Sequence, residues 1–307
     1  MNTVVIGTAF VDIKAFAHGS YDPNGRNLGS IKFVHGGVGR NVAENFANVG
    51  MPVSFVGMLE DSVTGRDVEE HLLSAGVCLD DAIRPQENGI GMWMVILDEH
   101  GALAGSISSM PDIKPLEDYL EKHAEDIIKE AENIVLEVDL NENIAEMVIE
   151  LAGKYNKKVF TIVGNMSVIL ARPDLIKKTS CFICNEIEAA KFFHNKTLTA
   201  FSPEQMAEYL PSAVKTNGIK AMVVTMGAHG AVFFDGENDG ENAGICGPEP
   251  TKVVDSTGAG DAFFSGTVMG LTRGMGLEEA VKYGAKLASR TISVDQNVCP
   301  VDKAFFA

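Results

Sequence analysis

The sequence predicts an α/β fold in which a mostly parallel sheet is covered by helices on both faces. Strand-like and helix-like stretches alternate from one end of the chain to the other. The 307 residues, 46% of them hydrophobic and 22% charged, can bury a large core and exclude a disordered chain. No internal repeat or linker interrupts the alternation, so we expect one domain over residues 1–307.

Each element of this prediction comes from a local pattern. Strands are expected at residues 1–13, 53–59, 134–138, 159–163, 181–184 and 221–225. Helices are expected at residues 39–49, 64–75, 115–131, 142–155 and 203–217. In the first of these helices, Val42, Phe46 and Val49 recur at helical spacing. Gly50 suits the left-handed turn that ends a helix, as Gly76 does for the second.

Two stretches depart from the alternation and predict a second, smaller sheet. Residues 89–108 predict a β-hairpin that turns at Asp98–Gly101. Residues 12–20 and 29–35 flank a connection rich in Gly and Asn and predict a second pair of strands. We expect the segments at about 12–35 and 88–110 to form a small β-sheet lid that excludes water from a reacting group. Surface hairpins without such a role are the alternative.

The charge balance and the apolar pattern exclude several kinds of partner. The 25 basic and 42 acidic residues give a net charge of −17, which argues against a nucleic-acid-binding surface. No apolar stretch approaches the roughly 20 residues that span a bilayer. The chain begins without the basic region and cleavage site of a signal peptide. The scattered, odd set of 5 cysteines is typical of a reducing compartment, so we expect a cytoplasmic protein.

Cys181 and Cys184 form a CxxC pair, which raises the question of a metal site. Their segment is short and apolar and predicts a strand, in which side chains three positions apart point to opposite faces. No second CxxC or HxxxH pair is present to complete a tetrahedral zinc site. We therefore expect both cysteines to be core residues, and we assign none of the 7 histidines to a metal.

The segment VVDSTGAGDAFFSG, residues 253–266, carries the clearest chemical signal. A helix is expected to begin near Ala259, which leaves the backbone N–H groups of Gly258, Ala259 and Gly260 at its N-terminus. Such N–H groups and the helix dipole predict an anion site. The Asp261 carboxylate would be repelled by that anion, so its presence there needs a reason. The reason that we expect is that it accepts a proton from an attacking hydroxyl. Capping of the helix by Asp261 is the alternative.

Four motifs resemble those of one family. DSTGAGDAFFSG, residues 255–266, resembles the C-terminal signature of the PfkB (ribokinase-like) sugar and nucleoside kinases, and residues 36–50, GGVGRNVAENFANVG, resemble the N-terminal signature. Asn185–Glu188 matches the family's NxxE motif and Thr225–Gly230 its TxGxxG motif. The resemblance implies an ATP-dependent kinase with a ribokinase-like three-layer α/β/α sandwich and a small β lid.

The resemblance also implies roles for single residues. Asp261 would be the general base that deprotonates the acceptor hydroxyl. Gly258, Ala259 and Gly260 would form the anion hole for the transferred phosphoryl group. ATP would contact Asn185, Thr225, Gly227, Gly230, Gly258 and Gly260. Asn185 and Glu188 would hold Mg²⁺, largely through its waters, and K⁺ would be an optional ligand of Asp255 and Thr257. The alternatives are that NxxE only caps a helix and that Gly36–Gly37 only form a turn.

The acceptor is expected to be a small sugar or nucleoside. Its hydroxyls would contact Asp12, at the end of the first strand, with Gly36, Gly37 and Asn41, and its distal part would contact Lys14, Met92 and Trp93. Residues 29–41 resemble the pseudouridine-kinase branch, so a pseudouridine-like nucleoside is favoured. The alternatives are a free sugar such as ribose or fructose, and a catalytically silent metabolite-binding relative. Trp93 either stacks on a base or packs beneath the lid.

Two other classes of protein fit the sequence less well. The first strand is followed by GTAFVD where a dinucleotide-binding oxidoreductase would carry GxGxxG. A Walker-type nucleotide site is not expected either, because the sequence has no GxxxxGK[ST] motif. The resemblance to kinases further implies a homodimer through the lid.

Overall fold

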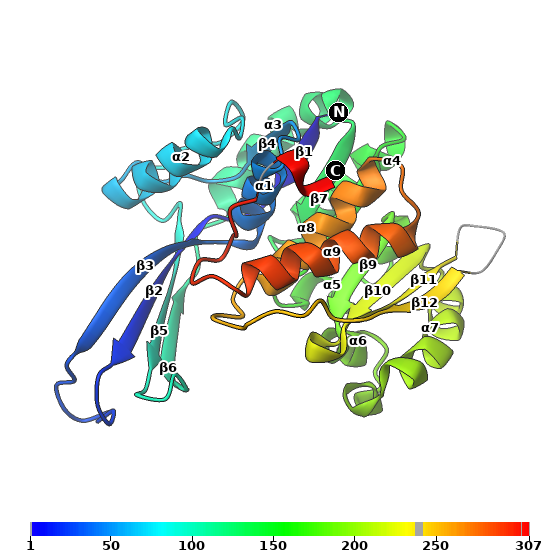
Figure 1. Ribbon diagram of the computed structural model, residues 1–307. Helices are drawn as coiled ribbons and strands as arrows, with labels where there is room; N and C mark the ends of the chain where they lie inside the picture. The colour runs from blue at the N-terminus through cyan, green and yellow to red at the C-terminus, as the bar shows by residue number, and fades with distance from the viewer. Residues whose placement is uncertain (1, 237–241, 302, 307) are drawn as a thin grey trace.

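The computed structural model describes residues 2–236, 242–301 and 303–306, which form two separate sheets (Figure 1). The strands of the larger sheet are β1 (Thr3–Ile6), β4 (Val53–Val56), β7 (Asn133–Glu137), β8 (Lys158–Ile162), β9 (Cys181–Asn185), β10 (Ala221–Thr225), β11 (Ala231–Asp235) and β12 (Asn242–Cys246). Their order is β12-β11-β10-β9-β8-β7-β1-β4. All neighbours from β4 to β10 are parallel, and only the β10–β11 and β11–β12 pairs are antiparallel. The predicted mostly parallel sheet is confirmed.

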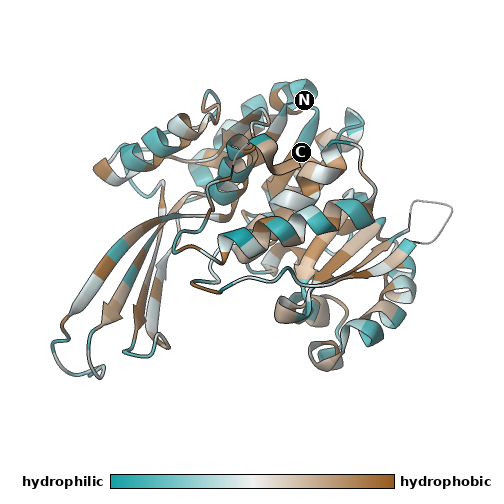
Figure 2. Ribbon diagram, viewed as in Figure 1, coloured by the Kyte–Doolittle hydropathy of each residue, from teal (hydrophilic) through white to brown (hydrophobic). Residues whose placement is uncertain are grey.

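Helices cover both faces of this sheet, as the sequence predicts. One core contains side chains of α3 (Lys114–Glu130), α4 (Glu142–Lys154), α5 (Ser167–Ala171), α6 (Glu186–Phe192) and α7 (Pro203–Asn217). The other contains side chains of α1 (Val38–Asn48), α2 (Val63–Ala75), α8 (Ala259–Thr272) and α9 (Leu277–Thr291). Within β1, Val4 and Ile6 join the first core and Val5 joins the second, because strand side chains alternate. In Figure 2 strands of the large sheet are mostly brown, whereas the helices carry both brown and teal segments.

The predicted helix ends are found where glycine permits a left-handed backbone. Ser62 caps α2 by accepting a hydrogen bond from the Gly65 N–H (3.0 Å). The helix ends at Gly76, whose φ is 95°. Gly50, just after α1, has a φ of 76°. The order of strands and helices in this part of the chain therefore follows from local sequence.

The smaller sheet forms from the segments predicted for it and stands away from the helical layers (Figure 1). Its strands are β2 (Phe10–Ala17), β3 (Gly29–Gly36), β5 (Gly91–Leu97) and β6 (Leu103–Ser109), in the order β3-β2-β5-β6. One detail of the prediction is wrong, because Asp12 lies within β2 and not at the end of the first strand. The chain leaves the large sheet after Ile6, where a Cβ on Gly7 would lie 2.7 Å from the Gly39 Cα.

The strand register divides the small sheet into two unlike faces. Asp12 lies opposite Val34 on β3 and Trp93 on β5, so these side chains share one face. The next row, which includes Ile13, Phe33 and Met94, points to the other face. Met92 lies on that outer face and is exposed. The expectation that Met92 contacts the acceptor is therefore wrong, since it alternates with Trp93.

The CxxC pair behaves as predicted. Cys181 is buried in the core beside α8, and Cys184 is buried in the core on the opposite face of the sheet. Burial raises the pKa of both thiols. Within the described ranges, no cluster of three or more His, Cys, Asp or Glu side chains is suited to a metal ion. The described helices also include none with the length and apolar character to cross a membrane.

Candidate active site

The carboxyl ends of the parallel strands bring the predicted motifs to one edge of the large sheet. In the order of the strands, this edge carries Thr225 on β10, Asn185 on β9, Gly164 after β8, Glu137 on β7 and Thr8 after β1. Open α/β sheets bind their ligands at this edge. Thr225 and Asn185, which are expected to bind the nucleotide, therefore lie at the ends of β10 and β9. The neighbouring strands β8, β7 and β1 end at a cavity.

A cavity of about 490 Å³ lies where this edge meets the inner face of the small sheet and the start of α8. The predicted residues that line it are Asp12, Gly37, Asn41, Trp93, Thr257, Gly258 and Asp261. The other lining residues are Thr8, Phe10, Val38, Ser108, Met110, Ile113, Glu137, Asp139, Leu140, Gly164, Asn165 and Asn297. The cavity thus combines carboxylates and amides with apolar and aromatic side chains.

Asp261, in the first turn of α8, accepts a hydrogen bond from one side chain of the described part of the chain. The amide Nδ2 of Asn41, on α1, donates a hydrogen bond of 2.6 Å to its Oδ2. Burial raises the pKa of Asp261 to about 7. Asn41 and Arg40 oppose this rise, and the carboxylates of Glu137 and Asp12 add to it. The group can accept a proton near neutral pH.

Asp12 is buried against a glycine pair that admits its carboxylate. A Cβ on Gly36 would lie 2.6 Å from the Asp12 Oδ1. Gly37 has a φ of 94°, and a Cβ there would lie 2.6 Å from the Thr8 carbonyl oxygen. The Asn297 Nδ2 donates a hydrogen bond of 2.6 Å to the Asp12 Oδ2. The pKa of Asp12 is raised by burial, which outweighs the Asn297 hydrogen bond.

The three backbone donors predicted at the start of α8 differ in whether they are already hydrogen-bonded. Gly258 is the N-cap, with a φ of 78°, and a Cβ there would lie 2.1 Å from the Asn297 carbonyl oxygen. The Ala259 N–H donates to the Ser256 carbonyl (3.2 Å), so this donor is already used. The N–H groups of Gly258 and Gly260 have no hydrogen-bond partner among the described residues. They are the donors left for an anion.

Lys14 points toward the loop before α8 and does not line the cavity. Its ammonium, on a side chain only 4% exposed, donates a hydrogen bond of 2.5 Å to the Asp255 Oδ2. The Asp255 Oδ1 accepts hydrogen bonds from the Thr257 N–H (2.9 Å) and Oγ1 (2.7 Å). Burial alone would raise the pKa of Asp255, but Lys14 and Thr257 lower it below its usual value. The structure therefore brings Lys14 to Asp255, and not to the acceptor cavity.

Asn185 and Glu188 form a capping box at the start of α6. The Asn185 Oδ1 accepts hydrogen bonds from the N–H groups of Ile187 and Glu188, both 2.9 Å long. The Glu188 Oε2 accepts one of 2.8 Å from the Asn185 N–H. Burial raises the pKa of Glu188. The Asn185 Oδ1 is already used by two backbone N–H groups, so the Glu188 carboxylate fits a water-mediated Mg²⁺ contact better than Asn185 does.

The TxGxxG residues lie beyond the cavity on the same edge. The Thr225 Oγ1 donates to the Cys184 carbonyl (3.4 Å), across the β9–β10 pair. Gly227 and Gly230 have φ values of 55° and 86°. A Cβ on Gly230 would lie 2.1 Å from the Cys246 carbonyl oxygen. Backbone geometry thus requires glycine in this motif.

Glu137 and Asn297 are site residues that the sequence did not reveal. The Glu137 carboxylate accepts hydrogen bonds from the Thr8 N–H (2.7 Å), the Thr8 Oγ1 and the Gly39 N–H (3.2 Å). Burial raises the pKa of Glu137. An acidic residue inside a predicted buried strand, 134–138, was the available signal. Asn297 lies in a segment with no regular pattern, and no signal pointed to it.

Comparisons with known proteins agree with this geometry. Residues 2–301 match the pfkB family carbohydrate kinases. A guanosine-inosine kinase of Exiguobacterium acetylicum is 34% identical over 97% of this chain and 96% of its own length. The pseudouridine kinase of Escherichia coli K12 is 25% identical over 95% and 90%. The structure of Arabidopsis thaliana ribokinase with ribose and ATP has a TM-score of 0.80 at 23% identity, over 99% of this chain and 96% of that one.

The fold is therefore that of the ribokinase-like α/β proteins. The chain belongs to the pfkB family of carbohydrate kinases. It is a sugar or nucleoside kinase, that is, a phosphotransferase whose acceptor is a hydroxyl group. Ribokinase-like kinases use ATP as the phosphoryl donor.

Proposed function

We propose that this kinase transfers the γ-phosphoryl group of ATP to a hydroxyl of a ribonucleoside, with Asp261 as the general base. The observation that carries the proposal is the position of Asp261. Its carboxylate, with a pKa of about 7, lines the cavity beside the free N–H groups of Gly258 and Gly260. A base and an anion site are thus adjacent, as in-line transfer to an alcohol requires.

The proposed reaction uses this arrangement directly. Asp261 accepts the proton of the acceptor hydroxyl, whose oxygen forms a bond to the γ-phosphorus. The bond from that phosphorus to the bridging oxygen breaks and releases ADP. The N–H groups of Gly258 and Gly260 donate to the phosphoryl oxygens as charge develops on them. Asp12, beside Gly36 and Gly37, and Asn41 hold the acceptor hydroxyls.

The nucleotide half of the site is proposed from the adjoining strands. Asn185, Thr225, Gly227 and Gly230 would line the path of the triphosphate at the ends of β9 and β10. Glu188 would hold the waters of Mg²⁺, with Asn185 fixing the start of α6. Mg²⁺, when bound, supplies positive charge that offsets the charge of the phosphates.

For the acceptor, the cavity favours a nucleoside over a free sugar. Polar groups around Asp261 suit a ribose, and Phe10, Trp93, Met110 and Ile113 offer apolar surface to a base. Two curated relatives are named for nucleosides, guanosine-inosine and pseudouridine. The guanosine-inosine kinase has the higher identity of the two. We therefore propose purine ribonucleosides as acceptors beside the pseudouridine-like nucleoside expected from the sequence.

Trp93 and Met92 provide a test, because they are neighbours on opposite faces of β5. In Trp93→Ala we expect kcat/KM for guanosine, inosine or pseudouridine to fall about 30-fold, since stacking is worth ~1–3 kcal/mol. Ribose should be affected less than twofold. Met92→Ala is the matched control. A higher kcat/KM for ribose or fructose than for every nucleoside would replace the nucleoside proposal by the free-sugar alternative. Binding of nucleosides without turnover of any acceptor would identify a silent relative.

The Lys14–Asp255 pair leads to a prediction about monovalent cations. A buried ammonium already neutralises Asp255 beside Thr257, where K⁺ was expected as an optional ligand. We expect wild-type kcat to be the same in KCl and NaCl. In Lys14→Met, kcat should fall about 10-fold or more, because Asp255 is left unpaired, and K⁺ or NH₄⁺ should restore part of it.

Steady-state assays in sodium, potassium and ammonium chloride measure this effect. Lys32→Met is the control, since Lys32 lies in the same sheet and pairs with Asp295 at 2.5 Å but is exposed. Potassium dependence of the wild-type enzyme would contradict the prediction.

We further propose a homodimer through the outer face of the small sheet. Ile31, Phe33, Met92, Met94 and Ile107 share this face and are between 40% and 72% exposed. In Figure 2 brown segments mark the strands of this sheet. The chain carries a net charge of −17, so two copies associate best through an uncharged surface such as this one.

Phe33→Glu is expected to make the protein monomeric, because it places like charges on both sides of a symmetric contact. Sedimentation measures the mass. Leu73→Glu, on the exposed side of α2, is the control. A wild-type monomer, or a dimer unaffected by Phe33→Glu, would contradict the proposal. The 5 free thiols and the use of ATP fit the cytoplasm, where we propose that the enzyme acts.

A further inference from the structure

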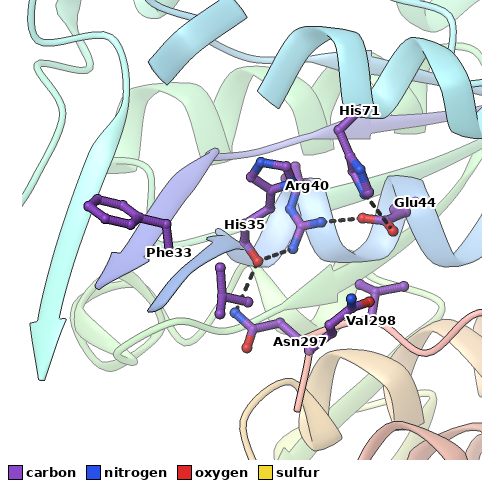
Figure 3. Close-up of a pocket in the computed structure, with 9 residues that line it drawn as sticks. Phe33, His35, Arg40, Glu44, His71, Asn297 and Val298 are labelled. Atoms are coloured by element: carbon purple, nitrogen blue, oxygen red, sulfur yellow. Dashed lines mark hydrogen bonds and ion pairs between the residues drawn. The ribbon is translucent and has the colours of Figure 1, made fainter. Parts of the chain in front are cut away.

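A second cavity, of about 230 Å³, is lined by Arg40, Glu44 and His71 (Figure 3), and it shares Asn297 with the acceptor cavity. Arg40 is 1% exposed, which makes it the most buried cation of the site. A buried guanidinium is costly unless every donor has a partner. The hydrogen-bond partners of Arg40 therefore indicate its role.

The planar guanidinium of Arg40 donates four hydrogen bonds. Its Nε donates to the Gly36 carbonyl (3.0 Å) and its Nη2 to the His35 carbonyl (2.5 Å). Its Nη1 donates to the Glu44 Oε2, and its Nη2 also donates to the Asn41 Oδ1. A guanidinium has no acceptor, so it can only bind the oxygen of the Asn41 amide. The other end of that amide, Nδ2, must then face Asp261, to which it donates at 2.6 Å.

We propose that Arg40 is the positioning residue of the general base: it fixes the Asn41 amide so that Asp261 always receives a hydrogen-bond donor. The proposal rests on the proposed function of Asp261. Without Arg40 the amide can rotate by half a turn and place its oxygen against the Asp261 carboxylate. Two acceptors then face each other, which favours the protonated acid and removes the base.

Glu44 and His71 hold Arg40 from its other side. Figure 3 shows the Glu44 carboxylate between the two, and the His71 Nε2 lies 2.9 Å from the Glu44 Oε1. The pKa of Glu44 is below its usual value, since His71 and Arg40 outweigh the effect of burial. The ring of His35, on β3, packs against that of His71 at a tilt of 57° with centroids 4.6 Å apart, and the His35 Nε2 lies 2.8 Å from the Asp67 Oδ2. Ionised Glu44 thus keeps the guanidinium in one orientation.

Arg40→Lys tests the proposal because it keeps the charge but cannot reach several acceptors at once. The measurement is kcat/KM from pH 5.5 to 9.5. The groups that face Asp261 are Asn41, Arg40, Asp12 and Glu137, and the substitution leaves their charges unchanged. We expect the acid limb of the profile to move up by about one pH unit. Activity should be about tenfold lower at pH 6 and within about threefold of wild type at pH 9.

Asn41→Leu removes the donor itself and should produce the same shift. The double variant of Arg40 and Asn41 should shift the limb no further than Asn41→Leu alone, because both changes act on one hydrogen bond. Glu44→Gln is expected to give a smaller shift in the same direction, and it supplies the test if Arg40→Lys does not fold. Arg66→Lys, at an exposed ion pair with Asp61, is the matched control.

An unchanged acid limb in Arg40→Lys, a loss of activity that is equal at all pH values, or additive shifts in the double variant would each overturn the positioning role. These results are distinct from a failure of the proposed function. That failure would appear as high activity in a variant that lacks the Asp261 carboxylate, whatever the state of Arg40.

Discussion

Asp261→Asn is expected to lower kcat about 10³-fold while the KM for ATP changes less than about threefold. The substitution keeps the shape of the side chain and removes the proton acceptor, and general-base catalysis contributes about 10²–10⁴ in rate. The loss belongs to the transition state, so nucleotide binding should survive. An ADP-release assay and calorimetry of ATP binding measure the two effects. Asp12→Asn is the contrasting variant, in which the KM for the acceptor should rise more than kcat falls. A kcat within tenfold of wild type in Asp261→Asn would show that another group is the base.

The same carboxylate predicts two effects of pH. Below pH 7 the wild-type kcat/KM should fall about tenfold per pH unit, because only ionised Asp261 accepts a proton and burial raises its pKa to about 7.

The stability of the protein should depend on the same group. Between pH 3.8, the ordinary pKa of an aspartate, and about pH 7, the folded state binds more protons at Asp261 than the unfolded state does. The free energy of unfolding therefore decreases as pH rises through this interval. Asp261→Asn removes the cost and should raise the free energy of unfolding at pH 8 by ~2 kcal/mol, with little change at pH 4.

Gly258→Ala is expected to reduce both kcat, by about 100-fold or more, and the free energy of unfolding, by ~2–4 kcal/mol. The residue has a φ of 78°, which costs alanine ~1–2 kcal/mol. Its Cβ would also lie 2.1 Å from the Asn297 carbonyl oxygen, so the start of α8 or the Asn297 segment must move. Either movement displaces the free N–H of Gly258 or the amide that donates to Asp12.

Substitutions at two other glycines separate the effect of the left-handed backbone from that of the contact with Asn297. Gly274→Ala has a φ of 86° but no atom within 4 Å of the new Cβ, so it should lose only the left-handed penalty. Gly153→Ala, within α4, has neither constraint. Urea denaturation and steady-state kinetics of the three variants provide the comparison. Equal losses in Gly258→Ala and Gly274→Ala would show that the contact with Asn297 has no role.

Local sequence predicted most of the strands and helices whose apolar pattern is regular, but not all of them. β12, a largely exposed strand with a central glycine, was not predicted, and β11 was also missed although Val232, Phe233 and Phe234 are buried. α9 was also missed, although Leu277, Val281 and Leu287 lie on its buried side. The sequence predicts one strand over residues 1–13, whereas the structure has β1 and β2 there, because sequence does not reveal the close approach of Gly7 and Gly39.

Most of the predicted site residues that meet in the structure sit in continuous motifs, and Asp12 and Trp93 are the exceptions. Asp261, Gly258, Gly37 and Asn41 do meet at one cavity. Lys14 was assigned to the acceptor, since its partner Asp255 lies 241 residues further along the chain. The roles of Arg40 and Asn297 depend on contacts made after folding, which residue spacing does not record.

The hydrogen bond between Asp12 and Asn297 joins positions 285 residues apart. During synthesis on the ribosome, Asp12 emerges long before Asn297 has been translated. Nascent chains that end before Gly258 would lack Gly258, Gly260 and Asp261 altogether. Prematurely terminated products are therefore expected to contain most of the strands of the large sheet yet to have no phosphorylating activity.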